Sequence, residues 1–194
     1  MAMECVNEPL KRYCFRCGET GHHSRNCNNE VCYNCFQTGH IAADCREGKR
    51  LKLDISELKD GEKIDLIWRK KPIWVVKRTQ KMLDSINTNE TKHKDPLSEN
   101  TEQQPNFAQN KFRSIRPEVL VLEGVCTHLG CNPAYNPDEN NFFCACHGSK
   151  FDMAGKVSNG SPAGANLKVP PYRFENDNTI IVGEMPEKVD IDKV

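Results

Sequence analysis

The sequence lacks long apolar runs, an export signal and net charge. Its most apolar run, Val119–Val125, is strand-sized and interrupted by Glu123, whereas a membrane-spanning helix needs about 18 or more apolar residues. The first ten residues have two acids, no serine and no apolar segment, unlike a secretory signal or a transit peptide. We therefore expect no transmembrane segment of its own. The 27 basic residues balance 27 acidic ones, so any attraction to nucleic acid or to an anionic membrane must be local.

Cysteine is the residue that the sequence has in excess, with 11 in 194 residues. Six of them, all in the first quarter of the chain, form two copies of the pattern Cys-x2-Cys-x4-His-x4-Cys. The eight residues of the pattern are Cys14, Cys17, His22 and Cys27, then Cys32, Cys35, His40 and Cys45. Three thiolates and one imidazole complete the tetrahedron that Zn(II) prefers, and the metal then replaces a hydrophobic core. The repeat predicts two zinc sites.

This spacing resembles the CCHC zinc knuckles of retroviral and cellular proteins, which bind single-stranded RNA or DNA. The resemblance implies that each copy presents an apolar platform on which an unpaired base stacks. The platform residues would be Phe15 and His23 in the first copy, and Tyr33 and Ile41 in the second. Residues 1–50 hold seven basic and six acidic residues, so a protein-contact or purely structural role is the alternative. Cys5 is interpreted as an ordinary free thiol, with the last ligand of a truncated earlier knuckle as the alternative.

Beyond residue 52 the sequence predicts short strands and few helices. Strands are expected at 63–68, 73–78, 119–125, 142–144, 167–169, 172–175 and 179–182, with a helix at 79–86. Residues 176–178, Asn-Asp-Asn, form the turn between the last two strands. Asn87–Gln104 is polar without periodicity, so we expect a solvated loop there. The pattern favours an antiparallel sandwich or a small barrel.

Two short segments, Cys126–Cys131 and Cys144–Ser149, carry the most specific pattern in the chain. They are C-T-H-L-G-C and C-A-C-H-G-S, so each brings a histidine and two cysteines together. A zinc site or a pair of structural disulfides would use the same residue types. Neither accounts for two matched loops with flanking glycines, whereas a [2Fe-2S] cluster held by two thiolates and two imidazoles does.

These loops resemble those of the Rieske iron-sulfur subunit of cytochrome bc-type complexes, which are C-T-H-L-G-C and C-P-C-H-G-S. The similarity covers about residues 51–184 and includes Trp68–Pro72, Asp95–Ser98, Gln104–Ala108, Gly148–Gly155 and Asn166–Tyr172. It implies a mainly β fold: an antiparallel Rieske-type β-sandwich with a smaller cluster-binding subdomain, here preceded by two zinc-knuckle modules.

The resemblance also implies roles for the loop residues. The [2Fe-2S] ligands would be Cys126, His128, Cys144 and His147. The two remaining loop cysteines, Cys131 and Cys146, would form a disulfide, and Ser149 would donate a hydrogen bond to a cluster sulfur. His147, together with His128, would face ubiquinol and couple electron transfer to proton transfer. The partners implied are a cytochrome b and a c-type cytochrome.

Three residues depart from the pattern of that family. Ala145 stands where proline usually lies between the second-loop cysteines, which frees a backbone φ that proline would fix. Phe151 stands where many members carry a tyrosine whose hydroxyl donates a hydrogen bond to a ligand sulfur. We therefore expect the cluster to have a lower reduction potential than in members with the tyrosine. Gly164 replaces a usual proline in the third loop, residues 160–166. We expect that loop to be more mobile.

The predicted organisation has six parts. They are a tail at 1–13, zinc knuckles at 14–27 and 32–45, a linker at 46–52, the Rieske domain at 53–184 and a tail at 185–194. Three hypotheses follow for function. The first is a one-electron carrier in an inner-membrane ubiquinol-cytochrome c reductase. The second is a soluble intracellular protein that binds single-stranded nucleic acid and senses redox state with its cluster. The third is a fusion of unrelated halves.

Overall fold

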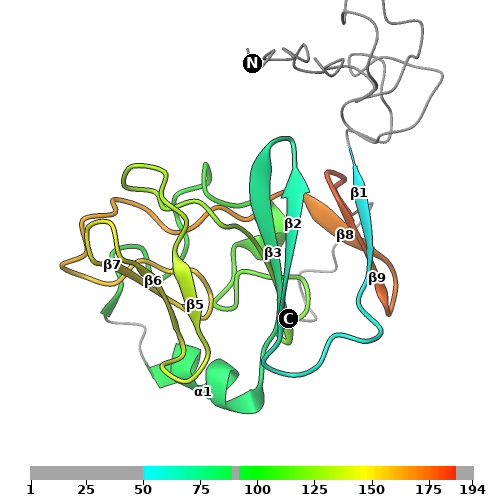
Figure 1. Ribbon diagram of the computed structural model, residues 1–194, viewed down its shortest axis with the longest axis horizontal. Coiled ribbons are helices and arrows are strands. Elements are labelled where there is room, and N and C mark those ends of the chain that lie inside the picture. The colour runs from blue at the N-terminus through cyan, green and yellow to red at the C-terminus, as the bar shows by residue number, and fades with distance from the viewer. Residues whose placement is uncertain (1–49, 89–91, 187–194) are drawn as a thin grey trace, which may run out of the picture. The chain divides into compact units, whose positions relative to one another are not determined.

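The computed structural model describes residues 50–88 and 92–186. These residues form nine strands in three antiparallel sheets, one α-helix and one 3-10 helix (Figure 1). The mainly β, antiparallel fold predicted from the sequence is confirmed. Among the described residues, no helix is both long enough and apolar enough to cross a membrane.

The first sheet joins the two ends of the described chain. Its strands are β1 (Leu51–Asp54), β9 (Thr179–Val182) and β8 (Tyr172–Asn176), in that order. All residues of the central strand β9 are buried, while β1 alternates half-buried leucines with exposed polar residues. The sequence predicted β8 and β9 but not β1, which begins inside the segment assigned to the linker.

The second sheet forms the body of the fold. Its order is β2 (Lys63–Trp68), β3 (Lys71–Lys77) and β4 (Val119–Glu123). All three strands match predicted ones to within about two residues. Arg69 and Lys70 connect β2 to β3 with φ of 49° and 65°. These left-handed values are typical of a two-residue hairpin turn, because they match the twist of the two strands.

The third sheet carries the second cysteine–histidine segment. It contains β5 (Ala134–Asn136), β6 (Asn141–Cys144) and β7 (Ser149–Asp152), with β6 in the middle. Cys144 pairs with Ser149 and Phe142 with Phe151. Residues that pair directly in antiparallel strands share a face, and all four of these side chains are buried. The inner face of this hairpin therefore presents a thiol and a hydroxyl next to two aromatic rings.

The helix matches its prediction, but one predicted strand is wrong. Helix α1 (Gln80–Thr88) buries Met82 and Ile86, which lie one turn apart. The 3-10 helix η4 covers Asn106–Ala108. Residues 167–169 form no strand, because the amides of Leu167 and Val169 bond to carbonyls of separate loops, at residues 155 and 103. Apolar composition indicated burial there, not a ladder.

The solvated loop expected at Asn87–Gln104 holds for most of its described residues, which are exposed, but three polar residues depart from it. The side chains of His93, Ser98 and Gln104 are buried. Nε2 of Gln104 donates to the carbonyls of residues 98 and 100 at 2.8 and 2.9 Å. Polar residues can be buried when backbone carbonyls satisfy them, which composition alone does not reveal.

Two buried arginines attach the third sheet to the body. Nη1 of Arg78 donates to the carbonyls of Phe112 and Met153, at 2.9 and 3.0 Å, and Nη1 of Arg113 donates to that of Ala154 at 3.1 Å. Burial lowers the pKa of both guanidinium groups to about 10. Both therefore stay protonated at neutral pH and fix the turn that follows β7.

Trp74 forms the central contact between the second and third sheets. Its ring, on β3, stacks on Phe142 of β6 with centroids 5.2 Å apart and planes at 15°. The same ring covers Gly124, where an added Cβ would lie 2.3 Å from Cε2 of Trp74. A side chain at 124 and the present position of this ring exclude each other.

Gly124→Ala should therefore destabilise the protein strongly, since the ring cannot move without losing its stacking on Phe142. Overpacking of this kind costs about 1–3 kcal/mol. Urea unfolding of the full chain measures the loss. Gly164→Ala is the matched control, because nothing lies within 4 Å of its added Cβ, and its effect should stay within about 0.5 kcal/mol. Equal effects at the two glycines would contradict the packing argument.

Candidate iron-sulfur site

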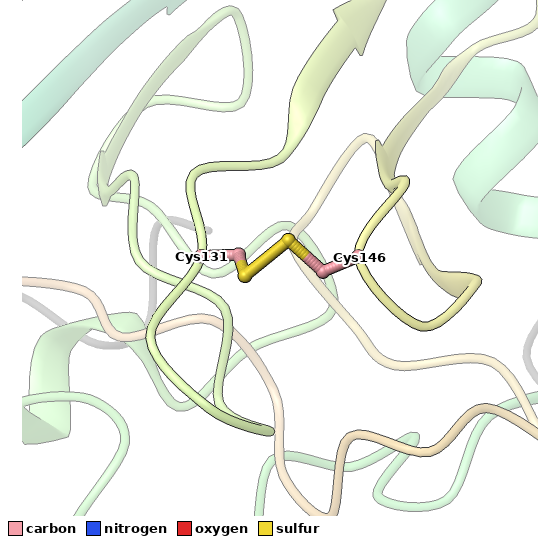
Figure 2. The surroundings of a disulfide bond; sticks show 2 residues. All are labelled: Cys131 and Cys146. Carbon is pink, nitrogen blue, oxygen red and sulfur yellow. A yellow bond between two sulfur atoms is a disulfide. The ribbon is translucent and has the colours of Figure 1, made fainter.

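The two cysteine–histidine loops lie side by side and are covalently joined. The first, Cys126–Cys131, follows β4, and the second, Ala145–Gly148, connects β6 to β7. A disulfide links Cys131 to Cys146, with Cα atoms 6.7 Å apart (Figure 2). This bond confirms the predicted pair. It ties the loops to each other although they come from different parts of the sheet arrangement.

The loops share one backbone turn, which positions the first cysteine of each. The amide of Gly130 donates to the carbonyl of Cys126 at 3.0 Å, and the amide of Gly148 donates to that of Cys144 at 2.9 Å. Both glycines have left-handed φ, 81° and 80°, a conformation that other residues adopt at a cost. The matched glycines in the sequence are thus matched turns in the structure.

Two free thiols lie at the base of the loops. Cys126 and Cys144 are 2% and 1% exposed and form no disulfide. They are close enough for a hydrogen bond between their side chains, and burial, followed by that bond, raises the pKa of the Cys144 thiol. The sulfur of Cys144 also lies within 4.8 Å of both disulfide sulfurs. Two buried, adjacent thiols without a disulfide suit a pair of metal ligands.

The two histidines meet at the outer end of the loops. Their rings, His128 and His147, lie 4.6 Å apart at 89° to each other. His128 is half-buried and His147 exposed. Nδ1 of His128 is buried and has no hydrogen-bond partner among the described residues. A buried imidazole nitrogen without a partner is unfavourable unless something binds it, so two thiols and two imidazoles fit a [2Fe-2S] cluster as a donor set.

Ser149 lies next to this donor set with its proton available. It is fully buried and pairs with Cys144 across the hairpin. Its Oγ accepts a hydrogen bond from the amide of Ala163 at 3.0 Å. Because that bond uses a lone pair, the hydroxyl hydrogen is left to donate elsewhere. Phe151, two residues further along β7, contributes only an apolar ring.

The third loop, residues 160–166, packs against the first. The hydroxyl of Thr127 donates to the carbonyl of Ala165 at 2.5 Å, and Lys94 donates to two further carbonyls of the same loop. Sequence reasoning missed both residues. Thr127 stands between two candidate ligands and could have been noticed. Lys94 gave no signal, since it belongs to the segment interpreted as a solvated loop.

The predicted zinc and nucleic-acid residues lie outside the described part of the chain. They are Cys14, Cys17, His22, Cys27, Cys32, Cys35, His40 and Cys45, with the platform residues Phe15, His23, Tyr33 and Ile41. The same holds for Cys5. These assignments stay predictions.

Two protein families match this chain, and one of them matches the region that contains the two cysteine–histidine loops. A family described as the Rieske [2Fe-2S] domain matches residues 53–171, and one described as the zinc knuckle matches residues 12–29 and 30–47. The first match spans most of the described residues, with all four candidate cluster ligands inside it.

Curated relatives are similar over the same region. The ubiquinol-cytochrome c reductase iron-sulfur subunit of Allochromatium vinosum is 44% identical over 147 residues, which is 71% of this chain and 70% of that protein. The subunit of the same name from Bradyrhizobium diazoefficiens is 38% identical, over 70% of this chain and 73% of that protein. The mitochondrial cytochrome b-c1 complex subunit Rieske of Theropithecus gelada is 36% identical, over 69% and 45%. By sequence, and by a fold that places the motif residues together, this chain belongs to the Rieske [2Fe-2S] family.

Proposed function

We propose that this chain is the one-electron carrier of a ubiquinol-cytochrome c reductase. The observation that carries the proposal is the convergence of two buried thiols and two contacting imidazoles on disulfide-linked loops. The 44% identity to a reductase subunit supports the choice of reaction. When bound, a [2Fe-2S] cluster takes up and releases single electrons.

In this proposal Cys126 and Cys144 would hold one iron and His128 and His147 the other. The buried, unpartnered Nδ1 of His128 is the nitrogen that would face the metal. Its Nε2 is then free to point outward. Both thiols are buried, whereas His128 is half-buried and His147 is exposed. The imidazole end is therefore the exposed end of the site.

The exposed end suits contact with ubiquinol. His147 is exposed, and Leu129, beside His128, is 70% exposed. A ring nitrogen of His147 can accept a hydrogen bond and then a proton from a quinol hydroxyl, while Leu129 supplies an apolar surface. The remaining loop residues hold these two groups in place through the disulfide and the glycine turns.

The partners in this proposal are a cytochrome b and a c-type cytochrome, and the location is an inner-membrane respiratory complex. The names of the relatives support a place in such a complex. We expect both cytochromes to contact the exposed end of the two loops, because the histidines lie at that end.

A second function is proposed for residues 12–47. Both repeats match the zinc-knuckle family, which supports two Zn(II) ions held by the eight predicted ligands. Single-stranded RNA or DNA is the ligand class that this chemistry fits, through base stacking on the platform residues. The two functions use separate residues and are tested separately.

The ligand assignment predicts that His147→Ala abolishes the cluster signal. The unmodified full chain should show the electron paramagnetic resonance spectrum of a mixed Cys/His [2Fe-2S] centre, and the variant should lose it because one iron loses a ligand. Ubiquinol-dependent reduction of a c-type cytochrome by the assembled complex should disappear with it.

Leu129→Ala is the matched control, since it alters the adjacent exposed loop without removing a donor. Its spectrum should equal that of the unmodified chain. An unchanged spectrum in His147→Ala would overturn the ligand assignment. A normal spectrum without any quinol-dependent activity would overturn the reductase proposal and leave the cluster in place.

Substitutions at Ser149 and Phe151 are expected to shift the reduction potential of the cluster in opposite directions, because one removes a hydrogen-bond donor and the other adds one. Ser149→Ala should lower the reduction potential because a donor is lost, and Phe151→Tyr should raise it because a hydroxyl is added on the same face. Each shift should be on the order of 59 mV, a tenfold change for a one-electron couple. Redox titration followed by electron paramagnetic resonance measures both.

Ser98→Ala is the control for removing a buried serine. Ser98 is fully buried, and its Oγ has no hydrogen-bond partner among the described residues, so the potential should not change. Equal potentials for Ser149→Ala and the unmodified chain would remove Ser149 from the cluster environment.

Metal content tests the zinc proposal. The purified full chain should contain two zinc and two iron atoms, because each repeat supplies one complete ligand set. Cys27→Ser should reduce zinc to one atom and leave iron at two, as measured by plasma mass spectrometry of the metals.

Binding of a labelled single-stranded oligonucleotide by the same samples tests the ligand class. Phe15→Ala should weaken binding by about 1–3 kcal/mol through lost stacking. Zinc without oligonucleotide binding would favour the structural or protein-contact role instead. Iron without zinc would reject the zinc sites.

A further inference from the structure

A segment far from the cluster loops in sequence runs alongside the chain that leads into the third loop. His93 forms an antiparallel β-bridge with Ser158. The amide of Lys94 donates to the carbonyl of residue 157 at 3.1 Å, and the amide of Asn159 donates to that of residue 92 at 2.7 Å. We call residues 92–95 the bracing segment. Residues 92–94 of this segment thus pair with residues 157–159 through a single bridge.

The far end of the third loop is held by the same segment. Nδ2 of Asn166 donates to the carbonyl of Asp95 at 3.0 Å, while its Oδ1 accepts the amide of Val157 at 2.9 Å. Asn166 is fully buried. The bracing segment therefore contacts both the residues before the third loop and the last residue in it.

Lys94 contacts the middle of the loop. Its Nζ donates to the carbonyl of Ser161 at 2.7 Å and to that of Ala163 at 2.8 Å. Hydrogen bonds from a charged donor are roughly twice as strong as neutral ones. Lys94 is an exposed residue, but its ammonium group is bound to backbone oxygens instead of pointing freely into solvent.

The loop residue that Lys94 holds is also the one that contacts Ser149. Ala163 is fully buried; its carbonyl accepts from Lys94 and its amide donates to Ser149 Oγ at 3.0 Å. A shift of Ala163 would change the orientation of the serine hydroxyl. Two hydrogen bonds thus connect an exposed lysine to a buried hydroxyl beside Cys144.

We infer that Lys94 is a positioning residue for the cluster site, which holds Ala163 so that its amide directs the Ser149 hydroxyl toward a cluster sulfur. The inference rests on the proposed function. Gly164, with open space around it and no side chain, contributes no restraint of its own. The loop conformation therefore depends on donors such as Lys94, Thr127 and Asn166.

A plain charge effect is the competing explanation, since removing a cation near a cluster also lowers its potential. A double-mutant cycle separates the two. If Lys94 acts through Ser149, its removal matters less once the hydroxyl is gone. If it acts by charge alone, the effect is the same with and without the hydroxyl.

The test measures the reduction potential of the full chain by redox titration in four forms: unmodified, Lys94→Met, Ser149→Ala and the double variant. Lys94→Met should shift the one-electron equilibrium toward the oxidised form by threefold to tenfold, and tenfold is about 59 mV. In the Ser149→Ala background the same change should have less than half that effect. Lys94→Arg, which keeps charge and donors, should restore most of the potential.

A readout independent of the potential is hydrogen exchange at the Ala163 amide, which should be faster in Lys94→Met. Lys168→Met is the matched control, because Lys168 is exposed and its side chain makes no hydrogen bond or ion pair described for residues 50–88 and 92–186. It should change neither quantity. Lys94→Gln replaces Lys94→Met if the latter folds poorly.

Two results would overturn the inference. One is a Lys94→Met shift of equal size in both backgrounds, which would assign it to charge. The other is an unchanged potential with normal exchange at Ala163. A failure of the proposed function is distinguishable. If the ligand assignment fails, the unmodified chain lacks the mixed Cys/His signal, and if the reductase proposal fails, the unmodified chain keeps that signal but lacks quinol-dependent activity.

Discussion

The stacking of Trp74 on Phe142 is the contact on which the site depends. Trp74 touches Gly124 and Phe142, which precede the two candidate thiolate ligands, Cys126 and Cys144, by two residues each. One ring on the central strand of the body thus fixes the start of both loops. Side chains two residues apart in a strand share a face, so on β6 the position of Phe142 also sets the direction of Cys144.

From that contact outward, each further restraint acts on a smaller part of the site. Buried Arg78 and Arg113 fix the turn after β7 through backbone carbonyls. The Cys131–Cys146 disulfide joins the loops, and the glycine turns orient the thiols. The candidate ligands are thereby held in place by the surrounding residues themselves, which is how precise metal sites are built. The histidine end stays exposed, where an electron donor or acceptor can approach.

The sequence predicted the parts of this arrangement that have a local signature. Strands β2, β3, β4, β6, β8 and β9, which were all predicted, alternate or run apolar, and the two loops carry a motif. Strand β1 alternates over only four residues and was assigned in part to the linker, whereas β5 and β7 are short, have no such signature and are defined by their partners. Residues 167–169 show the converse, as their apolar side chains are buried without a ladder. The bracing segment was not predicted either, because its polar groups bond to backbone groups that are distant in sequence.

The third loop shows how a site can depend on residues outside its motif. Proline would restrain such a loop through a fixed φ, which reduces the conformational entropy of the unfolded chain. Gly164 does the opposite, and the restraint then has to come from enthalpy, through the hydrogen bonds of Thr127, Lys94 and Asn166. Restraint of this kind is lost when a single donor is removed. The environment of the candidate cluster is therefore set partly at residue 94, about thirty residues before the first candidate ligand.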